Sequence, residues 1–283
     1  MLISEVIAKM KQYHKGTVNG KPIDEATTRD KILYGDPMQE CTGILTSCWA
    51  SVDVVRTAIE RGANLIIVHE ALFYNHGDHQ DWLLESGNKT YLAKKELLDK
   101  HGIVVWRDHD YIHSGIPYGD GYVDGIFYGV MKKLDWEKYL VDPIARPMTY
   151  VLPKTTARKV GEYVKERFHL NGIKVLGDLD APVEKVYISM HIMAQGALEN
   201  EIIKKIDSEQ IDCVLSLELI DYTVSEYIRD SAMLGFAKAI LAVGHFNMEE
   251  YGMEYMLKYL PQALGEAIPA SFVQSGDMYE FLV

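Results

Sequence analysis

The stretch NLIIVHEALFY, residues 64–74, decides the fold class and also raises the question of function. Its aliphatic run predicts a buried strand, which stops abruptly at His69 and Glu70. In a continuing strand these two side chains would point to opposite faces, so both can reach one site only if the chain turns there. A buried strand that ends on an imidazole and a carboxylate therefore indicates a site at the end of the strand.

Short aliphatic runs alternate with longer amphipathic segments along the whole chain. This alternation is typical of βα units around a largely parallel sheet, so the predicted fold class is α/β, with two halves of three layers each. The predicted strands are 41–49, 64–68, 103–106, 148–153, 185–190, 213–217 and 239–243.

A segment from about 115 to 150 separates the two halves. It is rich in Gly, Pro, Tyr and Asp, which predicts connecting structure rather than a regular element. We place the boundary near Arg146, which gives a first half of residues 1–146 and a second half of residues 147–283. The elements of the two halves are expected to intertwine.

The overall composition argues against several classes of protein. Lys and Arg number 29 against 41 Asp and Glu, and the net charge of -12 opposes binding to a phosphate backbone, so nucleic acid is not an expected partner. No apolar stretch approaches the length of a membrane span. The three cysteines, Cys41, Cys48 and Cys213, fit a reducing compartment, so the expected location is the cytoplasm.

Metal-competent side chains follow three of the predicted strands. Because ligands of open α/β sheets bind beyond the carboxyl ends of the strands, parallel strands would deliver these groups to one cleft. Within two of the pairs the residues are four apart, which places them on one face of a helix. Imidazole and carboxylate together suit Zn, Fe or Mn. The candidate ligands are His69, Glu70, His109, His113, His245 and Glu249.

Other histidines and motifs carry less information. His191 also follows a predicted strand, and a hydrogen-bonded structural role is the favoured interpretation, with a pocket role as the alternative. His76 lies on the loop after the first pair, where it is either solvated or at the border of a substrate site. The sequence contains no GxGxxG after a strand, no GxxxxGK[ST] and no GxSxG. No motif therefore indicates a dinucleotide-binding site, a P-loop or the nucleophile elbow of a hydrolase.

Several segments together resemble one known family over residues 30–262. GHFNMEEYGM (244–253) is similar to a Gly-His, three residues, Glu signature, and NLIIVHEALFY is similar to an aliphatic strand that runs into His-His-Pro-Leu. LSLELIDYTVSEYIRDSAMLG is similar to a segment in which a Glu, here Glu218, borders the cavity. The chain thus resembles the Nif-three-like dinuclear metal-centre hexameric proteins, also called GTP cyclohydrolase 1 type 2 homologues.

The resemblance implies two divalent metal ions per chain in an intramolecular cleft, a ring-shaped homohexamer, and the six ligands named above. Two positions depart from the family pattern: Glu70 replaces the second histidine, and His113 replaces an aspartate. The exchange keeps four imidazoles and two carboxylates, which favours a paired site. The alternative is a site reduced to one metal, with Asp110 in place of His113.

Two functions follow as hypotheses. The first is a metal-dependent hydrolase that acts on a nucleotide, GTP by the family label, or on another small molecule that contains phosphate. Glu218 and His76 are the candidates for a general acid or base. The alternative is a non-catalytic protein that binds metal or a partner and has a regulatory role.

Overall fold

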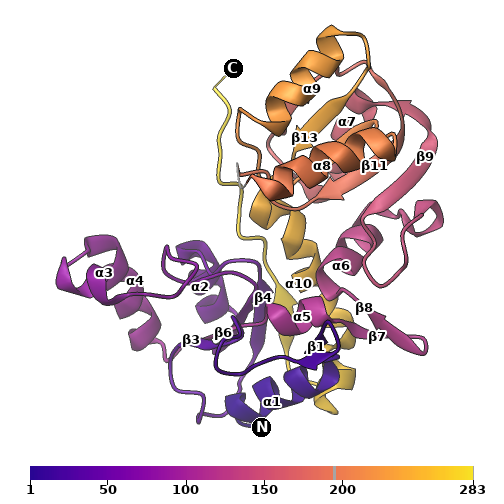
Figure 1. Cartoon of the computed structure of the whole chain (residues 1–283). Coiled ribbons are helices and arrows are strands. Elements are labelled where there is room, and N and C mark those ends of the chain that lie inside the picture. The colour runs from indigo at the N-terminus through magenta and orange to yellow at the C-terminus, as the bar shows by residue number, and fades with distance from the viewer. Residues whose placement is uncertain (194–195, 283) are drawn as a thin grey trace. The chain divides into compact units, whose positions relative to one another are not determined.

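The computed structural model describes residues 1–193 and 196–282 (Figure 1). The chain divides into two compact units, each assembled from separate segments. Unit 1 comprises residues 1–129 and 249–275, and unit 2 comprises residues 130–248 and 276–283. Among the described residues, no helix is both long enough and apolar enough to cross a membrane.

Unit 1 is built around a five-stranded mixed sheet in the order β14-β4-β5-β6-β3. Neighbouring pairs are parallel except at one edge, where β3 runs antiparallel to β6. The strands are β3 (Ile32–Tyr34), β4 (Ile44–Ser47), β5 (Leu65–Val68), β6 (Val104–Arg107) and β14 (Ala270–Phe272). Two short hairpins, β1 (Thr17–Val18) with β2 (Lys21–Pro22) and β7 (Ile116–Tyr118) with β8 (Gly121–Val123), lie outside this sheet.

Helices cover both faces of this sheet, because its central strands are apolar on both sides. The helices are α1 (Ile3–Tyr13), α2 (Val52–Glu60), α3 (Asp81–Glu85), α4 (Lys89–Lys100), α5 (Asp110–Ser114), α6 (Gly125–Leu134) and α10 (His245–Leu264). Leu45, Ile66 and Val105 share a core with residues of α2 and α4. Thr46, which points to the other face of β4, donates a hydrogen bond of 2.8 Å to the carbonyl oxygen of Met253 in α10.

Two glycines let α6 and α10 approach closely within unit 1. A Cβ added at Gly129 would lie 2.3 Å from the carbonyl oxygen of Tyr251, and one at Gly252 would lie 2.5 Å from Cα of Ile126. Any larger residue would force the helices apart. The close packing fixes the part of α10 that carries Glu249, one turn before Met253.

Unit 2 contains a second mixed sheet in the order β10-β13-β12-β11-β9. Its three central strands, β11, β12 and β13, are parallel to one another, and both edge strands are antiparallel. The strands are β9 (Thr149–Thr156), β10 (Lys174–Gly177), β11 (Pro182–Ser189), β12 (Cys213–Ser216) and β13 (Ala239–Ala242). The helices are α7 (Ala157–Phe168), α8 (Ala197–Ser208) and α9 (Val224–Met233), with a 3-10 turn, η1 (Glu137–Tyr139).

The faces of the second sheet are covered in the same way. Ile240 of β13 packs in a core with Ile206 of α8 and Ile228 of α9. The next residue, Leu241, points to the opposite face, where a Cβ at Gly161 of α7 would touch it at 3.5 Å. The period of two along β13 therefore places one helix layer on each side.

The predicted fold class, α/β with two sheets flanked by helices, is confirmed. Each predicted strand has a counterpart, and the sheet of unit 1 is largely parallel, as predicted, with one antiparallel edge pair. The sheet of unit 2 differs, because both of its edge strands run antiparallel. The segment 115–150 was predicted to lack regular elements, and this was wrong: it contains the β7-β8 hairpin and α6. Gly125 and Gly129 concealed that helix, because glycine is a poor helix former whereas here it serves close packing.

The sequence places a boundary near Arg146 between intertwined halves, and each unit of the structure consists of two segments. The chain leaves unit 1 after Gly129 and returns to it at Glu249, within α10. It returns because β14 pairs with β4 and completes the sheet of unit 1. Pairing between strands so distant in sequence leaves no local signal.

Candidate metal centre

The chain turns at the end of β5, as a site that uses both His69 and Glu70 requires. The backbone N–H groups of His69 and Glu70 both donate to the carbonyl oxygen of Cys48, each at 2.9 Å. Two consecutive donors on one acceptor break the alternation of a strand. Both side chains can therefore contribute to one cluster of donor atoms.

The loop after Glu70 is anchored by a buried lysine. Lys94 of α4 is 2% exposed and donates a hydrogen bond of 2.9 Å to the carbonyl oxygen of Leu72. Its ammonium lies 5.0 Å from the ring centroid of Trp49 and 5.4 Å from that of Phe73, within range of cation–π attraction. Burial lowers the pKa of Lys94 to about 7. These contacts attach the loop to α4.

Asp30 positions the two histidines that follow β6. Its carboxylate accepts hydrogen bonds from the backbone N–H groups of His109 at 2.9 Å and Asp110 at 2.7 Å. It thus satisfies orphan donors at the start of α5 and supplies a negative charge at the helix N-terminus. His109 is the residue that caps α5, and His113 lies four residues later in the same helix.

The imidazoles of His69, His109 and His113 each have the Nδ1 atom against an oxygen acceptor. For His69 the acceptor is the carbonyl oxygen of Asp108 at 3.0 Å. For His109 it is Asp110, and for His113 it is Asp124, both at 2.9 Å. Metal-binding histidines commonly donate one ring N–H in this way, which fixes the tautomer and leaves the other nitrogen for the metal.

These residues bring five donors together in unit 1, here called the unit 1 cluster: His69, Glu70, His109, His113 and Glu249. They form two overlapping groups, His69 with His109 and His113, and His69 with Glu70 and Glu249. Within each group the donor atoms all lie within 4.8 Å of one another. The rings of His69 and His109 stack with centroids 4.5 Å apart.

The donor set fits a divalent metal ion. His69 is fully buried, and burial lowers its pKa to about 3, so its ring is neutral at physiological pH, the form that binds metals. Its Nε2 atom has no hydrogen-bond partner among the described residues and lies 3.6 Å from Oε2 of Glu249. A buried polar atom without a partner is costly, and a metal ion would satisfy it.

Two further candidates lie at the edge of the unit 1 cluster. His76 is 55% exposed, and its Nδ1 lies 3.2 Å from Oε2 of Glu70. Asp110 accepts from His109, from the hydroxyl of Thr28 and from the backbone of Arg29, and these hydrogen bonds hold its pKa well below the usual range. Asp110 therefore supports His109 and belongs to none of the donor groups, whereas His113 does belong to one.

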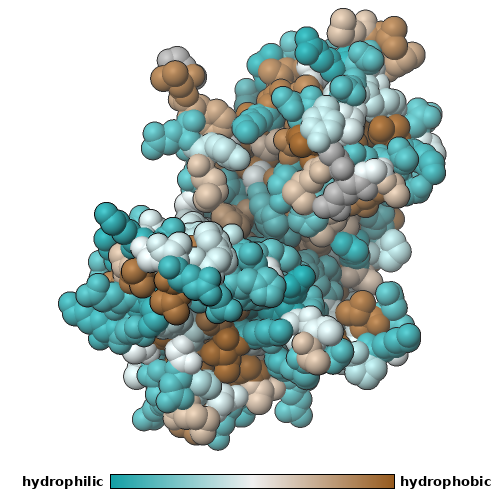
Figure 2. Space-filling model, turned by 60° about the vertical axis from the view of Figure 1, so that its left-hand side comes forward, coloured by the Kyte–Doolittle hydropathy of each residue, from teal (hydrophilic) through white to brown (hydrophobic). Residues whose placement is uncertain are grey.

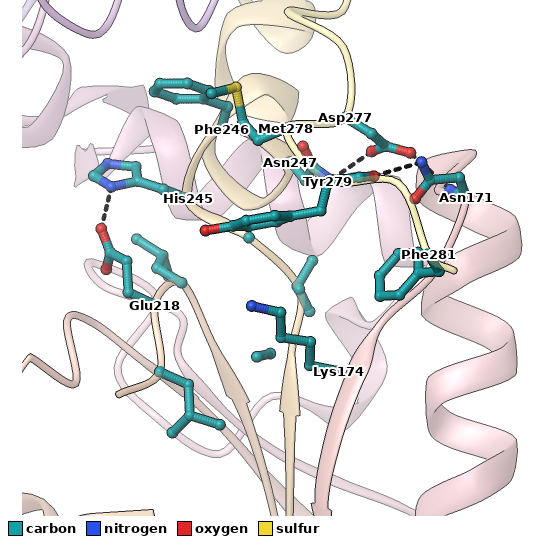
Figure 3. A pocket seen from close by; sticks show the side chains of 16 residues that line it. Asn171, Lys174, Glu218, His245, Phe246, Asn247, Asp277, Met278, Tyr279 and Phe281 are labelled. Atoms are coloured by element: carbon teal, nitrogen blue, oxygen red, sulfur yellow. Dashed lines mark hydrogen bonds and ion pairs between the residues drawn. The ribbon is translucent and has the colours of Figure 1, made fainter. Parts of the chain in front are cut away.

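His245 lies in a different set of side chains. In unit 2 it meets Glu218 and His191, and these three residues form the unit 2 cluster. The expectation that His245 acts as a metal ligand beside Glu249 stays a prediction, as does an acid–base role for Glu218. Figure 3 shows His245 and Glu218 pointing toward each other in a cavity of unit 2.

The sequence gives no local signal for the residues that support the donors, Asp30, Asp108 and Asp124. Asp30 lies far along the chain from His109, and Asp124 lies in the segment that the sequence predicts to be irregular. His191 had a usable signal, because it follows a strand just as His69 does. Cys41, Cys48 and Cys213 are free and buried, as small apolar residues.

Imidazoles and carboxylates gather at the ends of parallel strands in this chain, which places it among α/β proteins with candidate metal sites. The chain belongs to the Duf34/NIF3 (NGG1p interacting factor 3) family, whose profile matches residues 20–276. A curated relative, "GTP cyclohydrolase 1 type 2 homolog" of Clostridium acetobutylicum, is 22% identical over 243 residues, which cover 82% of this chain and 81% of the relative.

Solved structures share the fold. A hypothetical protein of Staphylococcus aureus matches with a TM-score of 0.68 at 14% identity, covering 100% of this chain and 99% of that one. A Bacillus cereus protein related to NIF3 matches with a TM-score of 0.63 at 15% identity and the same coverage. At these sequence identities the similarity establishes the shared fold alone. Evidence about function has to come from the residues of the site.

Proposed function

We propose that the chain is a metal-dependent hydrolase whose unit 1 cluster binds divalent ions. The observation that carries this proposal is the geometry of His69. Its Nδ1 is committed to the carbonyl oxygen of Asp108, and its buried Nε2, which lacks a hydrogen-bond partner among the described residues, points to the other donors. The imidazole is thus oriented and desolvated in advance, as a metal ligand requires.

The number of donors limits how ions can be held. His69 belongs to both donor groups but has one nitrogen left, so the two groups cannot both be complete at the same time. Two ions would divide the cluster, with His109 and His113 on one side and the carboxylates of Glu70 and Glu249 on the other. The exchange of residue types at positions 70 and 113 is compatible with that division, because each side keeps two donors.

The cluster is open on the side of α5. The side chains of His109 and His113 are 21% and 20% exposed, whereas those of His69 and Glu249 are 0% and 2% exposed. A substrate would therefore reach the cluster past α5. When bound, a divalent ion would act as a Lewis acid and lower the pKa of a water molecule that it binds. His76, whose ring centroid lies 6.0 Å from that of His109, could move a proton at this open side.

A substrate that contains phosphate fits this arrangement best. Positive charge from divalent ions beside neutral imidazoles favours anionic oxygens. The curated relative is named as a homologue of a GTP cyclohydrolase, which makes nucleotides the first compounds to try. The test is elemental analysis of the purified protein, then a panel of nucleotides and phosphate esters with and without added Zn, Fe or Mn. Activity that persists in His69→Ala would contradict the proposal.

A non-catalytic role is the second candidate. It is favoured by the burial of His69, Glu70 and Glu249, which are at most 7% exposed, since structural metal sites are closed by protein ligands. The two roles differ in exchangeable water: a catalytic site keeps an open position. Water relaxation with Mn bound would be enhanced for the hydrolase and unchanged for a closed structural site.

We further propose a homohexamer, on the basis of the family resemblance. Figure 2 shows hydrophobic residues at several places on the surface, among hydrophilic ones. At the end of α9, Met233, Leu234 and Phe236 are 75%, 70% and 66% exposed, which is unusual for a surface that stays in water. Light scattering should give the mass of six chains, and a monomer at micromolar concentration would contradict the proposal.

A further inference from the structure

Unit 2 contains another cavity, which shares no lining residue with the cavity that Glu218 and His245 line. Its walls come from η1 and the turn before it, from β9 and from α7. Its volume is about 380 Å³, within the range of about 300–1,000 Å³ that pockets for small ligands occupy. Leu152, Val160 and Trp136, which are all buried, give it apolar walls. A compact organic molecule would fit such a space.

Three of the lining residues are exposed lysines, one from each of the three segments: Lys138, Lys154 and Lys159. Lys138 and Lys159 form no ion pair with any residue that the structure describes. Lys154 lies 3.6 Å from Glu184, but both side chains are more than half exposed, and such a pair contributes little. Because the chain as a whole has a net charge of -12, three lysines around one cavity stand out as a local attraction for an anion.

The beginning of α7 adds to this positive charge. Thr156 caps the helix, and the first turn contains Lys159 but no acidic side chain. The backbone donors of this turn are already used, since the N–H of Arg158 donates to the carbonyl oxygen of Leu179 at 2.8 Å and that of Lys159 to the hydroxyl of Thr156. The helix therefore contributes its dipole, and direct contacts to an anion fall to the lysine side chains.

Aromatic rings stand beside the lysines. Trp136 and Tyr163 both line the cavity, and their rings are nearly parallel, with an interplanar angle of 9° and centroids 6.3 Å apart. The hydroxyl of Tyr163 donates a hydrogen bond of 2.7 Å to the carbonyl oxygen of Leu134, which fixes the ring. Tyr139 adds a third ring, 5.0 Å from the ammonium of Lys138. Rings held in this way suit a ligand that has a planar ring of its own.

The edge of β9 beside the cavity is unsuited to another strand. β9 pairs with β11 on one side, and on the other side Leu140 forms a bridge with Tyr150 near the start of β9. Further along the strand, Pro153 lines the cavity and has no N–H to donate. Proline at an edge discourages the addition of a strand, so a small molecule fits this place better than an extended peptide does.

We propose that this cavity binds a nucleoside monophosphate. Lysines bind phosphate as point charges, and three of them match the double negative charge of a phosphate monoester. Tyr139 and Tyr163 give a base aromatic partners, and Asp135 is the carboxylate among the lining residues that would accept hydrogen bonds from the hydroxyl groups of the sugar. The role exceeds the proposed function, which uses the donors of unit 1, and it requires no metal.

The experiment follows tryptophan fluorescence in full-length, metal-free protein, excited at the red edge of the tryptophan absorption. AMP, GMP, CMP and UMP are titrated, and each is compared with its nucleoside and with inorganic phosphate. At least one monophosphate should change the emission and saturate at one equivalent. Its nucleoside and phosphate should each bind at least about tenfold more weakly, because each lacks one of the recognised parts. The other tryptophans lie in unit 1, so Trp136→Phe should abolish the signal while calorimetry still detects binding.

Substitutions of the lysines locate the ligand. Lys154→Gln and Lys159→Gln should each weaken binding of the monophosphate by about fivefold, as expected for the loss of one exposed charge pair, and the double variant by about 25-fold. Arg158→Gln is the matched control and should bind like the wild type. It removes a positive charge from the same turn of α7, but Arg158 is paired with Asp180 at 3.0 Å and does not line the cavity.

Three results would overturn the proposal. The first is that none of the four monophosphates binds at millimolar concentration. The second is that inorganic phosphate binds as tightly as the monophosphates, since the rings would then have no role. The third is an equal loss in Arg158→Gln and Lys159→Gln, which would indicate general attraction to a basic surface. His69→Ala changes the unit 1 cluster alone and should leave this binding unchanged, so failure of one proposal is distinguishable from failure of the other.

Discussion

The unit 1 cluster and the unit 2 cluster support their imidazoles in different ways. Both stand at the carboxyl ends of parallel strands, but in unit 1 each imidazole has its own oxygen acceptor, whereas in unit 2 two imidazoles share the carboxylate of Glu218. His69 is fully buried, and His191 keeps 31% of its side chain exposed. The same position in a sheet can therefore produce donors that are each held by a separate acceptor or donors that hold one another.

The difference lies in what supports the donors. Unit 1 recruits Asp30, Asp108 and Asp124 from three separate segments, so its ligands are held even when no ion is present. The donors of unit 2 hold one another, which is a less demanding arrangement and a more adaptable one. Metal affinity should therefore depend most on single residues in unit 1.

The largest effect is expected for His69→Ala. His69 belongs to both donor groups of unit 1, so its loss removes a ligand from each and should weaken metal binding by more than roughly 100-fold. The loss should exceed that in His191→Ala, because His191 is more exposed and belongs to one group. Metal content by mass spectrometry after dialysis tests this order. His101→Ala, at an exposed position of unit 1, is the control, and equal losses in both units would break the comparison.

The sequence predicted the class of fold and most of the donors. The aliphatic runs of β5, β6 and β13 and the polar residues after them are local features, so the sequence could point to His69, His109 and His245 as candidate ligands. The antiparallel edges of the sheets could not be predicted, because β3 pairs with β6 and β10 pairs with β13, and each partner lies far along the chain. Asp124 was missed for a related reason, since its role exists only where α5 meets the turn before α6.

The next effect in size concerns a supporting carboxylate. Asp124→Asn removes the acceptor of the His113 N–H while keeping an oxygen for the backbone N–H groups of Ile126 and Phe127. Metal affinity should fall by roughly 10–100-fold, as for other residues that support a ligand. Isothermal titration with Zn²⁺ measures it. Asp120→Asn, in the exposed turn between β7 and β8, is the control, and unchanged affinity in Asp124→Asn would remove Asp124 from the site.

A smaller effect is expected from the burial of one histidine in unit 1. His14 is 4% exposed, and burial lowers its pKa from 6.5 to about 3. The unfolded chain therefore binds this proton first, so the corresponding stability is complete above pH 6.5 and is lost as the pH falls from 6.5 toward 3. Between pH 6.5 and 5.5 the loss is about 1 kcal/mol.

His14→Leu should abolish that part of the acid dependence. Urea unfolding of metal-free protein at several pH values gives the slope, which should be flatter for His14→Leu than for the wild type. His169→Asn is the matched control, because His169 is exposed and asparagine tolerates its left-handed backbone at a φ of 55°. Parallel slopes for His14→Leu and the wild type would show that His14 is protonated in the folded chain.

The smallest net effect is expected for a double exchange in unit 1. Glu70→His alone leaves the unit 1 cluster with four imidazoles and one carboxylate in place of three imidazoles and two carboxylates. This raises the net charge of the cluster by one unit and should weaken binding of the second positive ion. His113→Asp has the opposite effect on charge, and it also places a carboxylate beside Asp124, which repels it. Combined, the two changes restore the ligand inventory with the residue types exchanged between positions. The double variant should therefore bind more metal than the sum of the two single losses predicts, which is a favourable coupling in a double-mutant cycle.

If both single variants bind metal like the wild type, Glu70 is no ligand. Its contact with His76 would then be its role, as an acid that orients a base at the exposed edge of the cluster.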